Sequence, residues 1–530
     1  MKNMFRKLVA ALLIMSMLLS GVSFAAADGD KTVNVGVTGT LATINPMLMD
    51  ATEVVKYAVS LTFLPLVELN SKLEFVPMLA ESITTEDNTT FTIKLREDAV
   101  WSDGQPVTAE DVEYTLVINS KPESGNIALL RYAIEGVSDE GMIESDATSI
   151  SGVKVIDDKT LTITLKYPMA LYTFESNFGR YLMTLPKHVL QSYDAAAVQS
   201  SEWFNSPDVI SGPYFVTDYD LNHYVHFVAN ENYFMGAPKI KYLNFNILAA
   251  SQLLSGLTSG EIDIIQQTMG DIPLEDYEAV QALDSVETVM GAPITNQMVF
   301  VNVNTVPDVR IRQALLCGID RQTILEGLLN GNGEVVDGFL SSASPYFSEE
   351  LGVTAYDPEK AAALIAEAAA DGADTTITWH CNSGDSTMVQ AVEFIAAMFA
   401  EMGLNIEIRT VNLDTLMSVA SNGEHQVLSV QYTLPPVDPY TDIAWLLGGE
   451  GSWTNFGTDE INEALARSQT LTDPKEVAGE YLYINRVMQE QVPMLSAYII
   501  SGMGAVSKRL ENARPDVFGT FVNVHEWDVK

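Results

Sequence analysis

The chain has 530 residues, of which 47% are hydrophobic, and it carries a formal net charge of −41 at pH 7. A chain this long exceeds what one hydrophobic core supports, so we expect two or three globular domains. The composition excludes nucleic acid as a partner, because binding a polyanion requires a clustered basic surface. An acidic surface favours solubility and attracts cationic ligands at long range.

The first 25 residues have the features of a secretion signal. Three basic residues precede the apolar run Leu8 to Leu19, and small residues follow at positions suited to cleavage. The run is shorter than the roughly 20 residues that a membrane-spanning helix needs. No Cys occurs before Cys317. We therefore expect an exported protein, periplasmic or secreted, with a cleaved signal and no lipid-modified Cys.

The first elements of the mature chain are well marked. A strand is predicted at Lys31 to Val37, and Gly39, Thr40 and Leu41 follow its end. Apolar and polar residues then alternate from Phe91 to Leu95, which is the periodicity of a strand. After an Asp-Gly turn, the sequence pattern becomes that of a helix. A Thr is the expected N-cap, and an Asp three residues later is its expected capping-box partner.

An alternating α/β pattern continues to the C-terminus without an internal repeat. One helix has especially clear ends: Asp357 is the expected N-cap, Pro358 the first helical residue and Gly372 the residue beyond the end. Further strands are expected at Leu161 to Leu165, Val225 to Val228 and Tyr242 to Ile247, and helices at Gln252 to Thr258, Val309 to Leu329, Pro358 to Ala370 and Met388 to Met402.

Residues that would carry catalytic or metal chemistry are sparse. The sequence has no Gly-x-Ser-x-Gly, Walker, His-Glu-x-x-His or Cys-x-x-Cys motif, so we expect neither an enzyme nor a metal site. Only Cys317 and Cys381 occur, and their spacing matches no redox motif. In an exported protein these two residues are either buried free thiols or a disulfide.

Several segments, in order along the chain, closely resemble the extracellular solute-binding proteins of family 5, the peptide- and nickel-binding class that serves ABC importers. The most specific is FTIKLREDAVWSDGQPVTAEDVEYTL, which runs from Phe91 to Leu116. The others are SGPYFVTDYD at Ser211 to Asp220, NENYFMGAPKIKYLNF at Asn230 to Phe245, LTSGEIDI at Leu257 to Ile264 and FVNVNTVPDVRIRQALLCGIDRQTIL at Phe300 to Leu325. The resemblance covers nearly the whole mature chain.

The resemblance implies an α/β, two-lobed periplasmic binding protein fold of type II, of the large cluster with an extra subdomain. Lobe I would comprise residues 26–299, with an inserted subdomain at about 75–210. Lobe II would comprise residues 300–500, and residues 501–530 would return to lobe I. Strands near Met298 to Asn304 and Ser496 to Ala505 would act as the hinge. Such proteins bind and deliver a solute to a membrane permease, without a cofactor, and we expect a monomer.

The segment Gln431 to Leu447 bears most directly on the ligand. In peptide-binding relatives an aromatic residue is followed three residues later by an Asp, which pairs with the peptide's amino group, and then by an acidic-Pro pair. Tyr432 matches the aromatic residue and Asp438 the acidic one, but Pro435 stands where the Asp is expected. A buried ammonium ion without a carboxylate costs several kcal/mol. Either Asp438 or another carboxylate replaces that Asp, or the ligand has no free amine.

The candidate ligand-binding residues come from both predicted lobes. In the first lobe, relatives offer backbone groups to the ligand at the positions of Gly39, Thr40 and Leu41. In the second lobe, aromatic rings can stack on sugars or line pockets for apolar side chains. Ordinary core packing is the alternative for each residue. An oligosaccharide or a metal chelate is the alternative ligand on the same scaffold. The candidates of the second lobe are Trp379, Tyr432, Asp438, Trp453 and Asn455.

Overall fold

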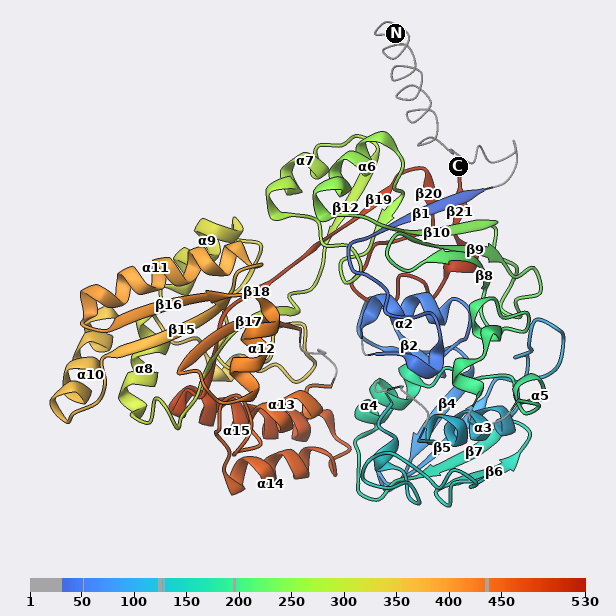
Figure 1. The fold of residues 1–530 in the computed structure, drawn as a ribbon, viewed down its shortest axis with the longest axis horizontal. Helices are drawn as coiled ribbons and strands as arrows, with labels where there is room; N and C mark the ends of the chain where they lie inside the picture. The colour runs from blue at the N-terminus through green and yellow to red at the C-terminus, as the bar shows by residue number, and fades with distance from the viewer. Residues whose placement is uncertain (1–30, 51, 123–125, 127–128, 194–196, 434–437) are drawn as a thin grey trace, which may run out of the picture.

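The computed structural model describes residues 31–50, 52–122, 126, 129–193, 197–433 and 438–530. Figure 1 shows two α/β bodies side by side, each organised around its own sheet. We call the body that begins with β1 (Thr32–Val37) lobe I and the body that contains β13 (Thr295–Val301) lobe II. The predicted two-lobed α/β fold is confirmed. The predicted secretion signal lies outside the described residues.

The main sheet of lobe I has β1 at its centre. Val33, Val35 and Val37 of this strand are fully buried, as the apolar alternation requires. β1 pairs in parallel with both β10 and β11. The sheet has seven strands in the order β12 (Val286–Met290), β19 (Met503–Ser507), β11 (Ile264–Ile265), β1, β10 (Tyr242–Ile247), β9 (Tyr224–Ala229) and β8 (Tyr214–Asp220). Helices α2 (Glu53–Ser60), α6 (Leu253–Ser259) and α7 (Tyr277–Gln281) belong to the same lobe.

A second, antiparallel sheet forms the lower part of lobe I in Figure 1. Its four strands are β4 (Ala80–Thr85), β5 (Thr90–Leu95), β7 (Thr160–Thr164) and β6 (Val153–Asp157), in that order. Alongside them lie β2 (Val67–Leu69), β3 (Phe75–Pro77), α3 (Ala109–Asn119), α5 (Lys187–Leu190) and α4 (Leu171–Phe174), which continues into a π-helical turn, Glu175–Gly179. Apart from β2, these elements fall within residues 75–210, the region predicted to be inserted.

The segment with the most specific family resemblance has a structural role. As the sequence predicts, α3 follows Thr108, whose backbone N–H donates to Asp111 Oδ2 at 2.8 Å. The other oxygen of Asp111 accepts from the backbone N–H of Lys187 at 2.9 Å. The buried indole of Trp101 donates to the same carboxylate at 3.4 Å. Asp111 thus joins the start of α3 to the start of α5.

Lobe II is a six-stranded sheet with helices on both faces. Its order is β14 (Gly333–Glu334), β18 (Met494–Ile500), β13, β17 (Val427–Thr433), β15 (Thr376–Asn382) and β16 (Asn405–Val411). One face packs on α8 (Val309–Gly318), α9 (Arg321–Leu329), α10 (Pro358–Ala370) and α11 (Ser386–Met402). The other packs on α12 (Leu413–Ser421), α13 (Tyr440–Leu446), α14 (Asp459–Ser468) and α15 (Pro474–Gln491).

The predicted helices and strands agree with the structure to within two residues at each end, with one exception. The expected single helix Val309 to Leu329 is wrong, because the structure divides it into α8 and α9. Ile319 is extended (φ −93°, ψ 120°), and Asp320 then caps α9 by accepting from the Thr323 N–H at 3.0 Å. As the N-cap of the second helix, Asp320 provides an acceptor for the backbone N–H groups of its first turn, which have no partner within the helix.

The chain passes between the two main sheets twice, once after β12 ends at Met290 and once after β18 ends at Ile500. The two connections touch, since the Gly291 N–H donates to the Gly502 oxygen at 2.9 Å. The second connection lies within the predicted hinge Ser496 to Ala505. The first lies before the predicted Met298 to Asn304, because β13 belongs to lobe II from Thr295 onward, and the predicted boundary at residue 299 therefore falls inside β13.

Of the two alternatives for the cysteines, the structure has free thiols. Cys317 and Cys381 are both buried and unpaired. Both belong to the lobe II core that includes α8 and α11. Across the ranges described, no helix is both long enough and apolar enough to cross a bilayer.

Candidate ligand-binding site

The segment after β1 contains two backbone N–H groups that have no acceptor within the described ranges. The amides on either side are used, since Thr38 N–H donates to Met269 O at 2.9 Å and Leu41 N–H donates to Leu221 O at 3.3 Å. The N–H groups of Gly39 and Thr40 donate to no residue within the described ranges. Thr40 is exposed, whereas Leu41 belongs to the lobe I core. Two of the three predicted residues therefore offer free amides, and the third packs internally.

Trp379 lies in the core of lobe II. It is fully buried, and its indole N–H donates to the Ser429 hydroxyl on the neighbouring strand. A side chain without exposed surface does not contact a ligand between the lobes. The structure therefore assigns Trp379 to core packing, in place of the predicted ligand contact.

Trp453 and Asn455 stabilise a loop at the end of β13 remote from the two connections. Trp453 is 8% exposed and packs edge-on against Phe300, with ring centroids 5.2 Å apart. Asn455 has a left-handed backbone (φ 50°), and its amide donates to Asn302 Oδ1 at 3.2 Å. Both ends of the Asn455 amide are used, because Gly451 N–H donates to its oxygen at 3.1 Å. Tyr432 pairs with Asn296 near the other end of β13, and the ring of Phe300, 6.4 Å from that of Tyr432, lies between Tyr432 and Trp453.

Tyr432 and Asp442 form a polar pair at the edge of lobe II. The half-buried Tyr432 donates its hydroxyl to Asp442 Oδ1 at 2.7 Å. Burial raises the pKa of Asp442 above its ordinary value, and the hydrogen bond from Tyr432 opposes that shift. Asp442 Oδ2 accepts no hydrogen bond from any described residue. This oxygen is therefore available to a donor on a ligand.

Asp438 is engaged by lobe I. Its side chain is 5% exposed, and its Oδ1 accepts from the Thr173 hydroxyl at 3.0 Å. Its Oδ2 accepts from the Asn177 amide at 3.1 Å. Burial raises the pKa of Asp438 to about 6. Both oxygens already have donors, and the buried carboxylate has little surface left for a ligand ammonium. Pro435, at the predicted amine-binding position, lies outside the described residues.

With this geometry in hand, the chain can be compared with known proteins. Residues 74–454 match the sequence model of the bacterial extracellular solute-binding proteins, family 5 Middle. The chain belongs to this family. A relative from Brucella ovis, named as an ABC transporter peptide-binding protein, is 25% identical over 96% of this chain and 95% of its own length. The nickel-binding periplasmic protein of Escherichia coli is 27% identical over 66% of this chain and 64% of its own.

Solved structures share the fold of this family 5 protein. AppA from Bacillus subtilis, in complex with a nonapeptide, superposes with a TM-score of 0.71 at 20% identity and covers 95% of this chain and 100% of its own. CtaP from Listeria monocytogenes gives a TM-score of 0.78 at 20% identity, covering 95% of this chain and 100% of its own. NikZ from Campylobacter jejuni, in complex with Ni(L-His), gives 0.71 at 19% identity, covering 94% and 99%.

Carboxylates near the interlobe region are the feature that sequence reasoning missed in this family 5 chain. Asp271 of lobe I stays open to solvent, yet the surrounding protein, and then the charge of Asp385 in lobe II, raise the pKa of its carboxyl. Within the described ranges, no Lys or Arg forms an ion pair with Asp271, Asp385, Asp438 or Asp442. The sequence did contain a signal for Asp442, because it lies four residues after Asp438, about the length of one helical turn.

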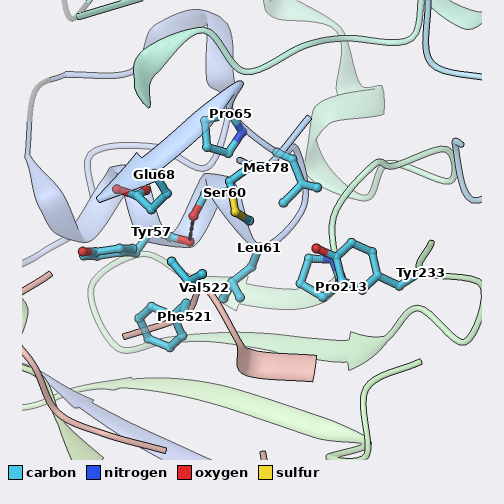
Figure 2. A pocket seen from close by; sticks show the side chains of 11 residues that line it. Tyr57, Ser60, Leu61, Pro65, Glu68, Met78, Pro213, Tyr233, Phe521 and Val522 are labelled. Atoms are coloured by element: carbon cyan, nitrogen blue, oxygen red, sulfur yellow. Dashed lines mark hydrogen bonds between the residues drawn. The ribbon is translucent and has the colours of Figure 1, made fainter. Parts of the chain in front are cut away.

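The pocket in Figure 2 lies within lobe I and is too small for a peptide. Its volume is about 20 Å³, which holds about one water molecule. Its wall is mostly apolar, with Leu61, Met78 and Phe521 among the lining residues. Glu68, at its edge, accepts from Arg180 Nε at 2.8 Å and from Lys56. The pocket is therefore a packing defect beside a buried ion network, and the ligand must bind elsewhere.

Proposed function

We propose that this family 5 protein is the substrate-binding component of an ABC importer, which captures a peptide or peptide-like solute between its lobes and delivers it to a membrane permease. The observation that carries the proposal is that each lobe has an open polar group near a position that the family resemblance assigns to the ligand. Lobe I offers the amides of Gly39 and Thr40, and lobe II offers the free oxygen of Asp442. Backbone donors suit peptide carbonyls, and a carboxylate suits an ammonium.

We assign the recognition of a ligand amine to Asp442. Pro435 carries no charge, and both oxygens of Asp438 accept from lobe I. An ammonium taken from water without a carboxylate partner costs several kcal/mol, so a nearby acceptor is required. Asp442 is the carboxylate next to Tyr432 that keeps an oxygen free. The peptide-binding relative that matches 96% of this chain supports the ligand class.

A metal chelate is the second candidate ligand. The similarity to the nickel-binding periplasmic protein supports it, as do the carboxylates that the two lobes contribute without cationic partners. A chelate with a net positive charge would be attracted by the same field as a peptide ammonium. The proposal also includes export by the signal in residues 1–25, release without a lipid anchor, a monomeric state and the absence of catalysis.

The test is thermal unfolding of the mature chain, from Ala26 on, with matched peptide pools whose N-termini are free or acetylated. A ligand at 100 times its dissociation constant stabilises by about 2.7 kcal/mol. We expect this shift with free termini and its loss in Asp442→Asn. Asp414→Asn is the matched control, because Asp414 occupies the first turn of α12 as Asp442 does in α13. Stabilisation by Ni-histidine, and by neither pool, would overturn the peptide reading in favour of the chelate.

A further inference from the structure

The two chain connections are not the sole contacts between the lobes. Figure 1 shows α4 and α13 facing each other across the lower part of the molecule, away from the connections. Thr173 of α4 and Asn177 of the following turn each donate to one oxygen of Asp438, immediately before α13. The Asp438 carboxylate thus joins lobe II to two residues of lobe I that lie 265 and 261 positions away from it in the sequence.

A second set of hydrogen bonds lies beside the first. Gln469, just after α14, accepts from the Ala170 N–H at 3.2 Å through its side-chain oxygen. Its backbone oxygen accepts from the Asn88 amide at 3.3 Å, and Leu471 O accepts from the same amide at 3.4 Å. Asn88 is 3% exposed and has a left-handed backbone (φ 55°), a conformation that Asn tolerates better than most residues. Lobe I therefore approaches this surface with backbone and side-chain donors.

In this contact lobe I supplies the hydrogen-bond donors and lobe II supplies the acceptors. An ionised carboxylate only accepts hydrogen bonds, so Asp438 requires donors from its surroundings once it is buried. Those donors come from lobe I, apart from the longer contact from Tyr440 N–H at 3.4 Å. Separation of the lobes would expose Asp438 to water, and water would then replace Thr173 and Asn177. The hydrogen bonds therefore exist only while the two lobes touch at this surface, an arrangement that we call closed.

We propose that the pairs Asp438–Thr173, Asp438–Asn177 and Gln469–Ala170 form an interlobe clasp, which sets the ratio of open to closed molecules before any ligand binds. The clasp excludes Gly39, Thr40 and Asp442, so it acts on the lobe equilibrium and makes no ligand contact. It goes beyond the proposed function, because it holds whatever solute the protein carries. A ligand that prefers the closed arrangement gains affinity in proportion to the closed population.

The expected change in the open-to-closed ratio follows from the usual free energy of a hydrogen bond. Loss of the neutral bond between Gln469 and Ala170 shifts the open-to-closed ratio by about 2- to 12-fold, and loss of a bond to the ionised Asp438 shifts it by about 12-fold or more. Removal of both lobe I donors also leaves the buried Asp438 carboxylate with the long contact from Tyr440 N–H as its remaining hydrogen bond among the described residues, which favours the open arrangement further. The double variant Thr173→Val/Asn177→Ala is therefore expected to change the ratio more than Gln469→Ala.

Single-molecule energy transfer on the ligand-free mature chain tests the clasp. Fluorophores are attached at Lys154→Cys in β6 and Lys475→Cys in α15, both exposed, while the buried Cys317 and Cys381 stay unlabelled. Thr258→Val is the control, because the Thr258 hydroxyl donates to Leu254 O at 2.7 Å inside α6. We expect less transfer in the double variant and in Gln469→Ala, and the wild-type distribution in the control.

An unchanged distribution in the folded double variant would overturn the clasp. Circular dichroism establishes folding, and if the double variant does not fold, Thr173→Val and Thr173→Ser decide. The Ser variant keeps the hydroxyl donor and should retain the wild-type distribution, whereas the Val variant should open. Equal distributions for Ser and Val would then contradict the proposal. No ligand is present in this experiment, so its outcome is independent of whether the protein carries a peptide.

Discussion

The hydroxyl of Tyr432 donates to Asp442 Oδ1 across 2.7 Å, and this bond orients the other carboxylate oxygen, which accepts from no residue within the described ranges. Tyr432 projects from β17 and Asp442 from α13, so the pair connects a strand of the lobe II sheet to a helix that covers it. A carboxylate held in place by a phenol is prepared for a cationic ligand before that ligand arrives. Such pre-organisation reduces the entropic cost of binding.

We expect Tyr432→Phe to weaken the binding of free-amine peptides by about 10-fold, roughly the value of one hydrogen bond to a charged group. The hydrogen bond from Tyr432 lowers the pKa of Asp442 against the effect of burial, so its loss should raise that pKa. As the solution is acidified, Asp442 should then become protonated, and binding should be lost, at a higher pH than in the wild type. Calorimetric titration between pH 4 and pH 8 measures both effects.

Tyr219→Phe is the control for that prediction, because the Tyr219 hydroxyl donates to Asn205 Oδ1 at 2.9 Å on the exposed side of lobe I. The control should bind as the wild type does at every pH. If Tyr432→Phe retains both the affinity and the pH profile, then Asp442 does not bind the amine through the arrangement described.

Protonation of Asp438 should stabilise the protein as pH falls. Burial raises the pKa of Asp438 from an ordinary value of 3.8 to about 6, and the groups whose charge or dipole faces it are Asp442, Tyr346, Tyr440 and Tyr481, without a cation. A raised pKa means that the native state binds the proton more tightly. The stabilisation is therefore complete below the unfolded pKa and is lost as pH rises through about 6.

The difference between the two pKa values corresponds to at most about 3 kcal/mol between pH 4 and pH 7.5. Urea unfolding of the wild type and of Asp438→Asn at several pH values isolates this contribution. Glu175, whose pKa burial raises to about 7, titrates in both proteins and cancels in the comparison. Identical pH dependences for the two proteins would mean that Asp438 does not titrate on unfolding.

Local features of the fold were predictable from sequence, and contacts between distant segments were not. Asp357, Pro358 and the Gly after the helix define α10 because N-cap, first-turn and end preferences act over a few residues. The break at Ile319 was missed because that residue is apolar, buried and suited to a helix. The pairing of Asp438 with Thr173 depends on how two lobes approach, and no local pattern encodes it.

The candidate site shows the same division. The motif that aligns Tyr432 predicts a ligand contact at this residue, and the structure places its hydroxyl on Asp442, a neighbour that the motif did not indicate. The sequence pattern did not reveal that Trp379 is fully buried. An aromatic residue on a strand gives the same pattern whether its side chain packs against helices or faces solvent. Burial is a property of the assembled layers, which α8 to α11 complete from other parts of the chain.

Glu68→Ala should strongly destabilise lobe I. The Glu68 carboxylate is buried between Lys56 and Arg180, and its loss leaves two buried cations with the single carboxylate of Glu53. Breaking a buried ion pair costs about 3–5 kcal/mol. The measurement is chemical unfolding, and Glu81→Ala is the control, because the Glu81–Lys94 pair is exposed and solvent screens its attraction. Equal losses in both variants would contradict the burial argument.

Gly502→Ala should disturb the connection between the lobes. A Cβ at this position would lie 2.6 Å from Gln267 Cγ and 2.8 Å from its Cδ, so the Gln267 side chain would have to leave the space between the two connections. Overpacking of this kind costs about 1–3 kcal/mol. We expect a lower unfolding temperature together with a changed distance distribution between the lobes in small-angle X-ray scattering.

The control for the Gly502 prediction is Gly479→Ala within α15, where an added Cβ meets no atom within 4 Å. Ala is the better helix former by about 1 kcal/mol, so this variant should be slightly more stable than the wild type, with unchanged scattering. Opposite signs for two identical substitutions would show that space beside Gln267, and not chain flexibility in general, requires the glycine. If Gly502→Ala matches the wild type in both measurements, the Gln267 side chain moves freely and does not fix the arrangement of the connections.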